Sequence, residues 1–169
     1  MPSSSPRATP RRSRTSEPLT ARPLTSGEVA LARHVFGDAI DYARATIARS
    51  KWAFFQPRRV VMAPRGCIHF HPTGTLYRDD FADAALTDQG LFIHEMTHIW
   101  QHQKGIFLPI ARHPFCRYGY ALHPGWPLAR YGIEQQAEIV RHAFLLRAGA
   151  RVAGAPSIDQ YESVLPFRG

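Results

Sequence analysis

The sequence has few cysteines and no long hydrophobic run. Cys67 and Cys116 are the only cysteines among 169 residues, and they form no Cys-x-x-Cys motif. A disulfide-rich scaffold is therefore excluded, and we expect two buried thiols. No apolar stretch is long enough to span a membrane, and none follows the Arg-rich N-terminus as it would in a secretory signal. We expect no membrane partner and, by default, a cytoplasmic protein.

Acidic residues are scarce relative to basic ones. The chain has 13 Asp and Glu against 21 Lys and Arg, which gives a formal net charge of +8. Half of this charge lies before residue 24, where five arginines accompany a single acid, Glu17. Residues 1–23 are mostly Ser, Pro, Arg and Thr, so we predict a disordered basic tail there and one domain at residues 24–169. The charge left for this domain is modest, so a nucleic-acid partner is not expected.

The hydrophobic pattern predicts a mixture of helices and strands. A capping box at Thr25 and Glu28 begins a first helix, which ends at Gly37. Residues 38–52 fit either a helix or a strand. The pattern further predicts a β-hairpin from Arg59–Met62 and Cys67–His71, a helix from Thr87 to Lys104 capped by Thr87 or Asp88, and a helix from Ile133 to Ala148. The Pro- and aromatic-rich connection 106–131 is long enough to be a functional or covering loop.

The helix at 87–104 contains His94 and His98 four residues apart, with Glu95 directly after the first. At about 100° per residue both histidines lie opposite the apolar arc of the helix. Their arc has no Lys, Arg or Asp between His94 and Gln103, which is unusual for a solvent-exposed face. Four residues advance about 6 Å, so the two imidazoles can bind one Zn²⁺ while Glu95 reaches a water as general base.

A third metal ligand is needed, because a catalytic zinc usually takes three protein ligands. The extended metzincin motif is absent after His98. The helix at 133–148 has Glu134 and Glu138 on a strip beside its apolar stripe, and a buried carboxylate there needs a partner such as a metal ion. The alternative is an exposed strip in which Glu138 pairs with Arg141 or His142.

Two features of the sequence resemble known families. "HEMTH", followed 36 residues later by "EQQAE", resembles the gluzincin pattern of zinc metallopeptidases. The segments "LTSGEVALARHVFGDAIDYARATI", "GCIHFHP", "LFIHEMTHIWQ" and "YGIEQQAEIVRHAFLLR" resemble small bacterial proteins labelled Vgr-related. Those proteins are similar to a metallopeptidase-like domain that accompanies contractile injection systems. The likeness extends from about Leu24 to Phe167.

The resemblance implies an α+β, zincin-like fold, in which the active-site helix lies beside a small sheet and a C-terminal helix supplies a ligand. It assigns His94 and His98 as zinc ligands, Glu95 as the base and Glu134 as the third ligand. Glu138 then orients a ligand imidazole, although Glu in place of the usual Asp leaves open that the two glutamates exchange roles. It also favours a strand at "DYARATI". The implied function is hydrolysis of a peptide or protein substrate by an injection-system component, and export by a specialised secretion system is compatible with it.

Two other functions remain open. In peptide deformylases a cysteine from a preceding strand is the third ligand, a place that Cys67 could take, but the other deformylase motifs are absent. The zinc could instead stabilise the fold of a structural or adaptor protein that cleaves no peptide. For the enzyme, the candidates for stabilising the oxyanion are Tyr118, Tyr120, Tyr131, His113 and His123. His69 and His71, on the strand face of Cys67, could border the substrate cleft.

Overall fold

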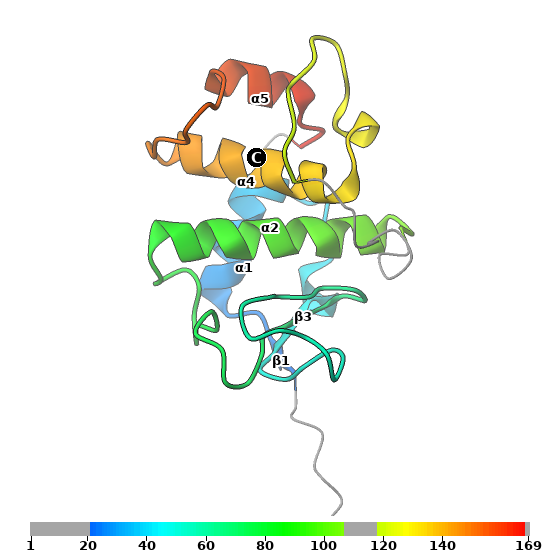
Figure 1. Cartoon of the computed structure of the whole chain (residues 1–169), viewed down its shortest axis with the longest axis vertical. Coiled ribbons are helices and arrows are strands. Elements are labelled where there is room, and N and C mark those ends of the chain that lie inside the picture. Colours follow the sequence, from blue (N-terminus) through cyan, green and yellow to red (C-terminus); the bar gives the residue numbers. More distant parts are fainter. Residues whose placement is uncertain (1–20, 107–117, 168–169) are drawn as a thin grey trace, which may run out of the picture.

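The computed structural model describes residues 21–106 and 118–167, which form an α+β fold. A three-stranded sheet is followed in space by helix α2 (Leu86–Gln103), then by α4 (Ile133–Arg147) and α5 (Ile158–Val164), as Figure 1 shows. Helix α1 (Ser26–Phe36) packs against α2. The predicted fold class is confirmed as α+β, and the two helices that carry the candidate ligands lie side by side. Helix α5 was not predicted.

The ends of the helices follow local rules in α1 but not in α2. In α1 the predicted capping box is present: the amide of Glu28 donates to Thr25 Oγ1 at 3.0 Å, and the amide of Thr25 donates to Glu28 Oε2 at 2.9 Å. This helix ends at Gly37, where φ is 54°. Helix α2 starts after Ala85 without a side-chain cap, so the predicted capping by Thr87 or Asp88 is wrong. Asp88 is instead paired with Arg78, at 2.9 Å.

The sheet is built differently from the predicted hairpin. Its strands are β1 (Arg22–Pro23), β2 (Thr46–Ala48) and β3 (Cys67–His69), in that order. Strand β3 pairs with β2 in parallel, which places Ile68 beside Ile47 in the core. The run 59–62 forms no strand and contributes one antiparallel bridge, from Met62 to His69. The strand expected within "DYARATI" is found at its end only, because residues 42–44 form a 3-10 turn.

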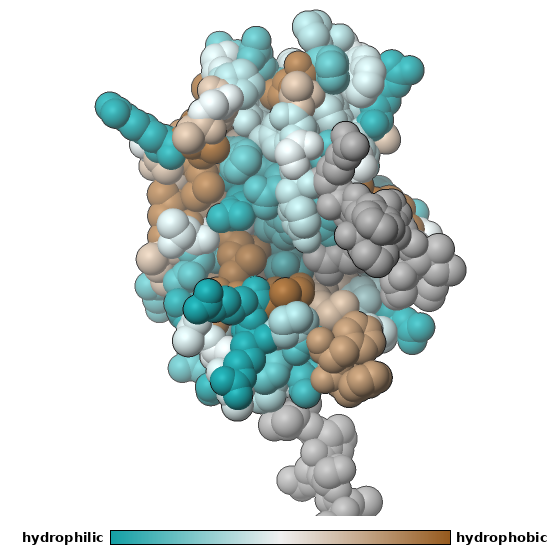
Figure 2. Space-filling model, viewed as in Figure 1, coloured by the Kyte–Doolittle hydropathy of each residue, from teal (hydrophilic) through white to brown (hydrophobic). Residues whose placement is uncertain are grey.

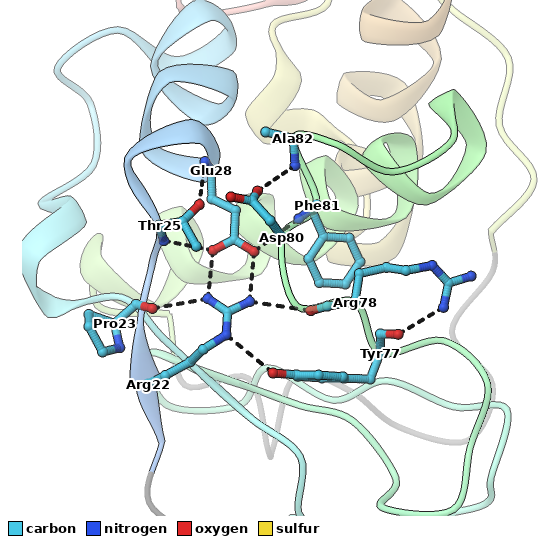
Figure 3. A network of polar contacts seen from close by, with 9 residues as sticks. All are labelled: Arg22, Pro23, Thr25, Glu28, Tyr77, Arg78, Asp80, Phe81 and Ala82. Carbon is cyan, nitrogen blue, oxygen red and sulfur yellow. Dashed lines mark hydrogen bonds and ion pairs between the residues drawn. The ribbon is translucent and has the colours of Figure 1, made fainter.

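The start of the described chain is anchored by a buried ion pair. Residues 1–20 of the predicted tail lie outside the described residues, but Arg22 and Pro23, assigned to the end of that tail, form β1. Arg22 Nη1 and Nη2 each donate to one carboxylate oxygen of Glu28 at 2.8 Å, and Arg22 Nε donates to Tyr77 Oη at 3.3 Å (Figure 3). The bonds to Glu28 raise the pKa of Arg22. The pair ties β1 to Glu28, a fully buried residue in the first turn of α1.

Helices α2 and α4 are antiparallel and closely packed (Figure 1). Gly90 allows the close approach: a Cβ at this position would lie 3.1 Å from Leu145 Cδ2. The apolar arc of α2 faces the core, where Phe92 stacks on Phe81 with ring centroids 5.4 Å apart. Residues 92–99 are all buried, so the histidine-bearing arc of α2 is covered as well. In the described part of the chain, no helix has the length and apolarity needed to cross a bilayer.

Replacing Arg22 tests the anchor. We expect Arg22→Ala to lower the free energy of unfolding by about 3 kcal/mol, because Glu28 is left as a buried carboxylate without its counter-ion. Thermal or urea unfolding followed by circular dichroism measures the change. Arg147→Ala, which removes the more exposed pair with Glu162, is the control and should cost less than about 1 kcal/mol. Equal effects of the two changes would contradict the anchoring role.

Candidate metal centre

Three side chains from α2 and α4 converge on one point. Glu134 Oε2 lies 3.3 Å from His94 Nε2 and 3.3 Å from His98 Nε2. The three residues are 5%, 0% and 1% exposed for His94, His98 and Glu134 respectively. Two ligands at about 2.0–2.1 Å from a tetrahedral zinc lie about 3.3 Å apart, which fits these contacts. This group could hold a metal ion.

A chain of amide groups orients His98. The side chain of Gln136 donates to the carbonyl of Tyr131 at 2.7 Å, so its oxygen faces Gln101, whose amide donates to it at 2.9 Å. The same amide nitrogen also donates to the carbonyl of Ile133, at 3.0 Å. The oxygen of Gln101 therefore faces His98 Nδ1, at 2.8 Å, and this nitrogen carries the hydrogen. The lone pair of His98 is left on Nε2, the nitrogen that points at Glu134.

A different chain of contacts lies behind His94. Its Nδ1 is 2.8 Å from Glu138 Oε1, and Glu138 Oε2 is 3.3 Å from His142 Nε2. The chain continues from His142 Nδ1 to the hydroxyl of Tyr120 at 2.6 Å and on to the hydroxyl of Tyr161 at 2.8 Å. Burial alone would raise the pKa of Glu138, but the contacts with His142 and His94 hold it well below its usual range. Glu138 is thus an anion on the side of His94 away from Glu134.

The electrostatics of the centre favour a cation. Burial alone would lower the pKa of His94, but Glu134 and Glu138 outweigh it and raise this pKa to about 9. Without a metal, the carboxylates therefore keep a proton on His94, a proton that a metal ion would displace. Among the described residues, the buried atoms His98 Nε2 and Glu95 Oε2 have no hydrogen-bond partner. Buried polar atoms of this kind need an explanation, and a bound ion with its water is one.

A cleft of about 350 Å³ opens beside the three residues. It is lined by His94, Glu95 and Glu138 together with Arg59, Val60, Val61, Leu91, Tyr118 and Arg141. The ring of Tyr118 is stacked on that of His94, with centroids 6.4 Å apart. A second cavity of about 550 Å³ shares Tyr118 and Glu138 with this cleft. Glu95 is therefore placed at the wall of an open cleft and next to the candidate ligands.

The other residues named as candidates for oxyanion stabilisation lie elsewhere or are otherwise engaged. The hydroxyl of Tyr120 belongs to the chain behind His94. The hydroxyl of Tyr131 accepts the backbone N–H of His123 at 2.9 Å, and the ring of His123 lies against Trp126. His113 is outside the described residues. Of the four candidates that lie within the described residues, Tyr118 is the one that lines the cleft.

The candidates on β3 do not join this centre. Cys67 is not a member of the cluster, so a deformylase-type ligand set is not formed among the described residues. Its thiol is free, and burial raises its pKa. His69 contacts the carbonyl of Ser50 at 3.3 Å, and neither His69 nor His71 lines the cleft. The expectation that these two histidines border it is therefore not met.

The residues that orient the two histidines were not predicted from the sequence. Gln101 follows His98 by three positions on the same helix face, which is a local signal that could have indicated contact. Gln136 contacts Gln101 across 35 residues, and no pattern in the sequence indicates this pairing. The alternative in which Glu138 pairs with Arg141 or His142 is also partly right, because both contacts exist at 3.3 Å. They occur together with the contact to His94, on a side chain that is only 14% exposed.

The comparisons identify relatives in a secretion system. No protein-family model matches the sequence. The type VI secretion system spike protein VgrG2b of Pseudomonas aeruginosa strain PAO1 is 43% identical over 134 residues, which are 73% of this chain and 13% of that protein. The solved effector domain of Pseudomonas aeruginosa VgrG2b superposes with a TM-score of 0.71 and 37% identity, over 89% of this chain and 86% of the domain. The expected relation to Vgr proteins is confirmed.

Replacing each glutamate separates a ligand from a supporting residue. Glu134→Ala should lower Zn²⁺ affinity by more than about 100-fold, because its Oε2 faces both Nε2 atoms. Glu138→Ala should lower it by about 10- to 100-fold, the usual effect of a residue behind a ligand. Competition with a chromophoric chelator measures both affinities, and the exposed Glu162→Ala is the control. A larger loss in Glu138→Ala than in Glu134→Ala would exchange the two roles.

Proposed function

This chain belongs to the family of the VgrG2b effector domain, and on that premise we propose that it is a zinc metallopeptidase with a zincin-like fold. The observation that carries the proposal is the convergence of His94 Nε2, His98 Nε2 and Glu134 Oε2 beside the cleft that Glu95 lines. Two imidazoles and one carboxylate are a ligand set of catalytic zinc sites, which keep one position free for water. The substrate class is a peptide or protein.

In this proposal the chain's own residues divide the work of holding and using the ion. His94, His98 and Glu134 hold the zinc, while Glu138 orients His94 and Gln101 orients His98. A bound zinc supplies Lewis acidity that polarises the scissile carbonyl and lowers the pKa of a water. Glu95 takes the proton of the attacking water and returns it to the leaving amine, as a general base and then a general acid. Its buried, unpartnered Oε2 is available for that proton.

Tyr118 is proposed to stabilise the developing oxyanion. Its ring is stacked on His94 and lines the cleft, and the residue is 53% exposed, so a substrate can reach it. A phenol hydroxyl donates a hydrogen bond to negative charge that forms on the carbonyl oxygen. Of the five candidates from the sequence, it is the one whose position in the described structure supports this role.

A non-catalytic adaptor is the alternative function. In that case the metal would only link α2 to α4. Structural zinc sites are closed by four protein ligands, whereas the cluster formed by the described residues has three members and an adjoining cleft. Oε2 of the buried Glu95 has no hydrogen-bond partner among the described residues, and no structural bond therefore occupies it. Both observations favour catalysis over a purely structural metal.

The relative's name assigns it to a type VI secretion spike. We extend this to the present chain and propose that it is an injection-system component, with export through that apparatus. Since the chain spans 13% of the spike protein's length, the activity and partners of the whole spike are not transferred to it. Co-purification of the chain with a spike protein of its own cell tests the association, and separate elution of the two would contradict it.

Glu95→Gln tests catalysis. This nearly isosteric change should leave the fold and Zn²⁺ stoichiometry intact and lower cleavage of unfolded casein at least about 100-fold, because the amide cannot take the proton of water. The readout is the release of peptides by the zinc-loaded protein, and Glu162→Gln is the control. If the zinc-loaded wild-type chain cleaves neither casein nor its own N-terminal segment, the adaptor function replaces the enzyme.

Tyr118→Phe tests the oxyanion role. Loss of one donor should lower kcat by about 100-fold with little change in KM, because the hydrogen bond strengthens only as charge develops. Steady-state cleavage of a fluorogenic peptide measures both constants. Zinc affinity should be unchanged, since the ring remains on His94. A fall in zinc affinity with kcat preserved would make Tyr118 a support for the ligand.

A further inference from the structure

The connection between β2 and β3 presents two phenylalanines to solvent. Phe54 is 89% exposed and Phe55 is 66% exposed, and their rings meet edge to face at 5.2 Å. Figure 2 shows a hydrophobic patch at the lower right of the molecule, over the loop drawn in cyan in Figure 1. Two large aromatic side chains that lie next to each other in water are unusual on a protein surface, and they indicate a site that binds a partner or a membrane.

This aromatic tip, residues 52–56, is held by an ordered base. Gln56 is 3% exposed, and its oxygen accepts the backbone N–H of Trp52 at 2.8 Å. Its amide donates to the carbonyls of Val60 at 2.8 Å and His69 at 2.9 Å. Lys51 Nζ also donates to the carbonyl of Phe54 at 3.1 Å. The hydrogen bonds fix the backbone on both sides of the phenylalanines, so their exposure is built into the fold.

Positive charge surrounds the aromatic tip. Residues 49–66 contain five cations and no acid: Arg49, Lys51, Arg58, Arg59 and Arg65. Within the described ranges no carboxylate pairs with Lys51, Arg58 or Arg59, whereas Arg22 and Arg78 elsewhere have such partners. Arg65 lies over the ring of Trp52, with its Cζ 5.3 Å from the ring centroid. The tip thus has cations on both sides of it in the sequence, and two of them, Lys51 and Arg65, contact it.

We propose that this loop docks the protein onto the surface of an anionic lipid bilayer. Aromatic side chains partition into the interface, and Lys and Arg near it are attracted to anionic headgroups. Both phenylalanines are exposed, and a deformable interface accommodates such side chains without a matching pocket. Peripheral binding requires only apolar insertion and charge, so it needs no membrane-spanning helix, and residues 21–106 and 118–167 contain none.

Docking through this loop would also place the cleft close to the membrane surface. Arg59, Val60 and Val61 follow the aromatic tip in sequence and line the cleft beside His94 and Glu95. A bilayer bound at Phe54 and Phe55 would therefore lie next to the cleft. Lipid binding does not depend on the proposed peptidase activity, and the two can be tested separately.

Vesicle binding of the full chain tests the proposal. We expect it to co-sediment at low salt with vesicles that contain phosphatidylglycerol, and much less with vesicles of phosphatidylcholine alone. Phe54→Ser combined with Phe55→Ser should weaken binding about tenfold or more. Both side chains are exposed, so the unfolding temperature should not change.

A charge variant with a matched control completes the test. Arg58→Gln should weaken binding and reduce its salt dependence, whereas Arg151→Gln, in the exposed connection between α4 and α5, should not. The proposal is overturned if the wild-type chain does not bind phosphatidylglycerol vesicles, or binds both kinds of vesicle equally. It is also overturned if the phenylalanine variant binds like the wild type, because the basic N-terminal segment would then account for the attraction.

Discussion

Helices α2 and α4 meet through their polar faces, and this contact decides how the buried polar groups of both helices are satisfied. Helix α2 is buried on its apolar side by the sheet and α1 and on its histidine side by α4. A polar group removed from water costs free energy unless it finds a partner. Hydrogen bonds satisfy Gln101 and Gln136, but His98 Nε2 carries a lone pair that points toward a carboxylate. A cation between them resolves this conflict.

The two histidines are supported by chemically different chains of contacts, and the difference would affect a metal bound between them. His98 is oriented by neutral amides that end on backbone carbonyls. His94 is next to the anion Glu138. A carboxylate behind an imidazole makes it a stronger donor to a metal and increases its hold on a proton. In the proposed metal site, His94 is thus the histidine at which metal and proton would compete, whereas the bond to Gln101 fixes the orientation of the His98 ring.

Local rules explain what the sequence could predict. The capping box, the helix end at Gly37 and the position of both histidines on one arc depend on residues within one or two turns of each other. The hairpin prediction failed because β3 found a partner some 20 residues earlier in the chain, in β2. Which glutamate is the candidate metal ligand depends on the nitrogen of His94 that each one contacts. Glu134 lies at Nε2 and Glu138 at Nδ1. The helix register places both glutamates one turn apart and cannot distinguish these two contacts.

The small sheet has a function beyond completing the core. The carbonyl of His69, in β3 at the edge of the sheet, accepts a hydrogen bond from the side-chain amide of Gln56. The backbone of His69 also forms the bridge to Met62, in which the His69 N–H donates at 2.8 Å and the Met62 N–H donates at 3.2 Å. The same residues that hold the aromatic tip thus hold the segment 59–61, which forms one wall of the cleft. Movement of the tip without the wall would break the bonds from Gln56 to Val60 and His69. A membrane surface that binds the aromatic tip would therefore also contact or shift the segment 59–61. Because this segment lines the cleft, docking would affect how a substrate reaches Glu95.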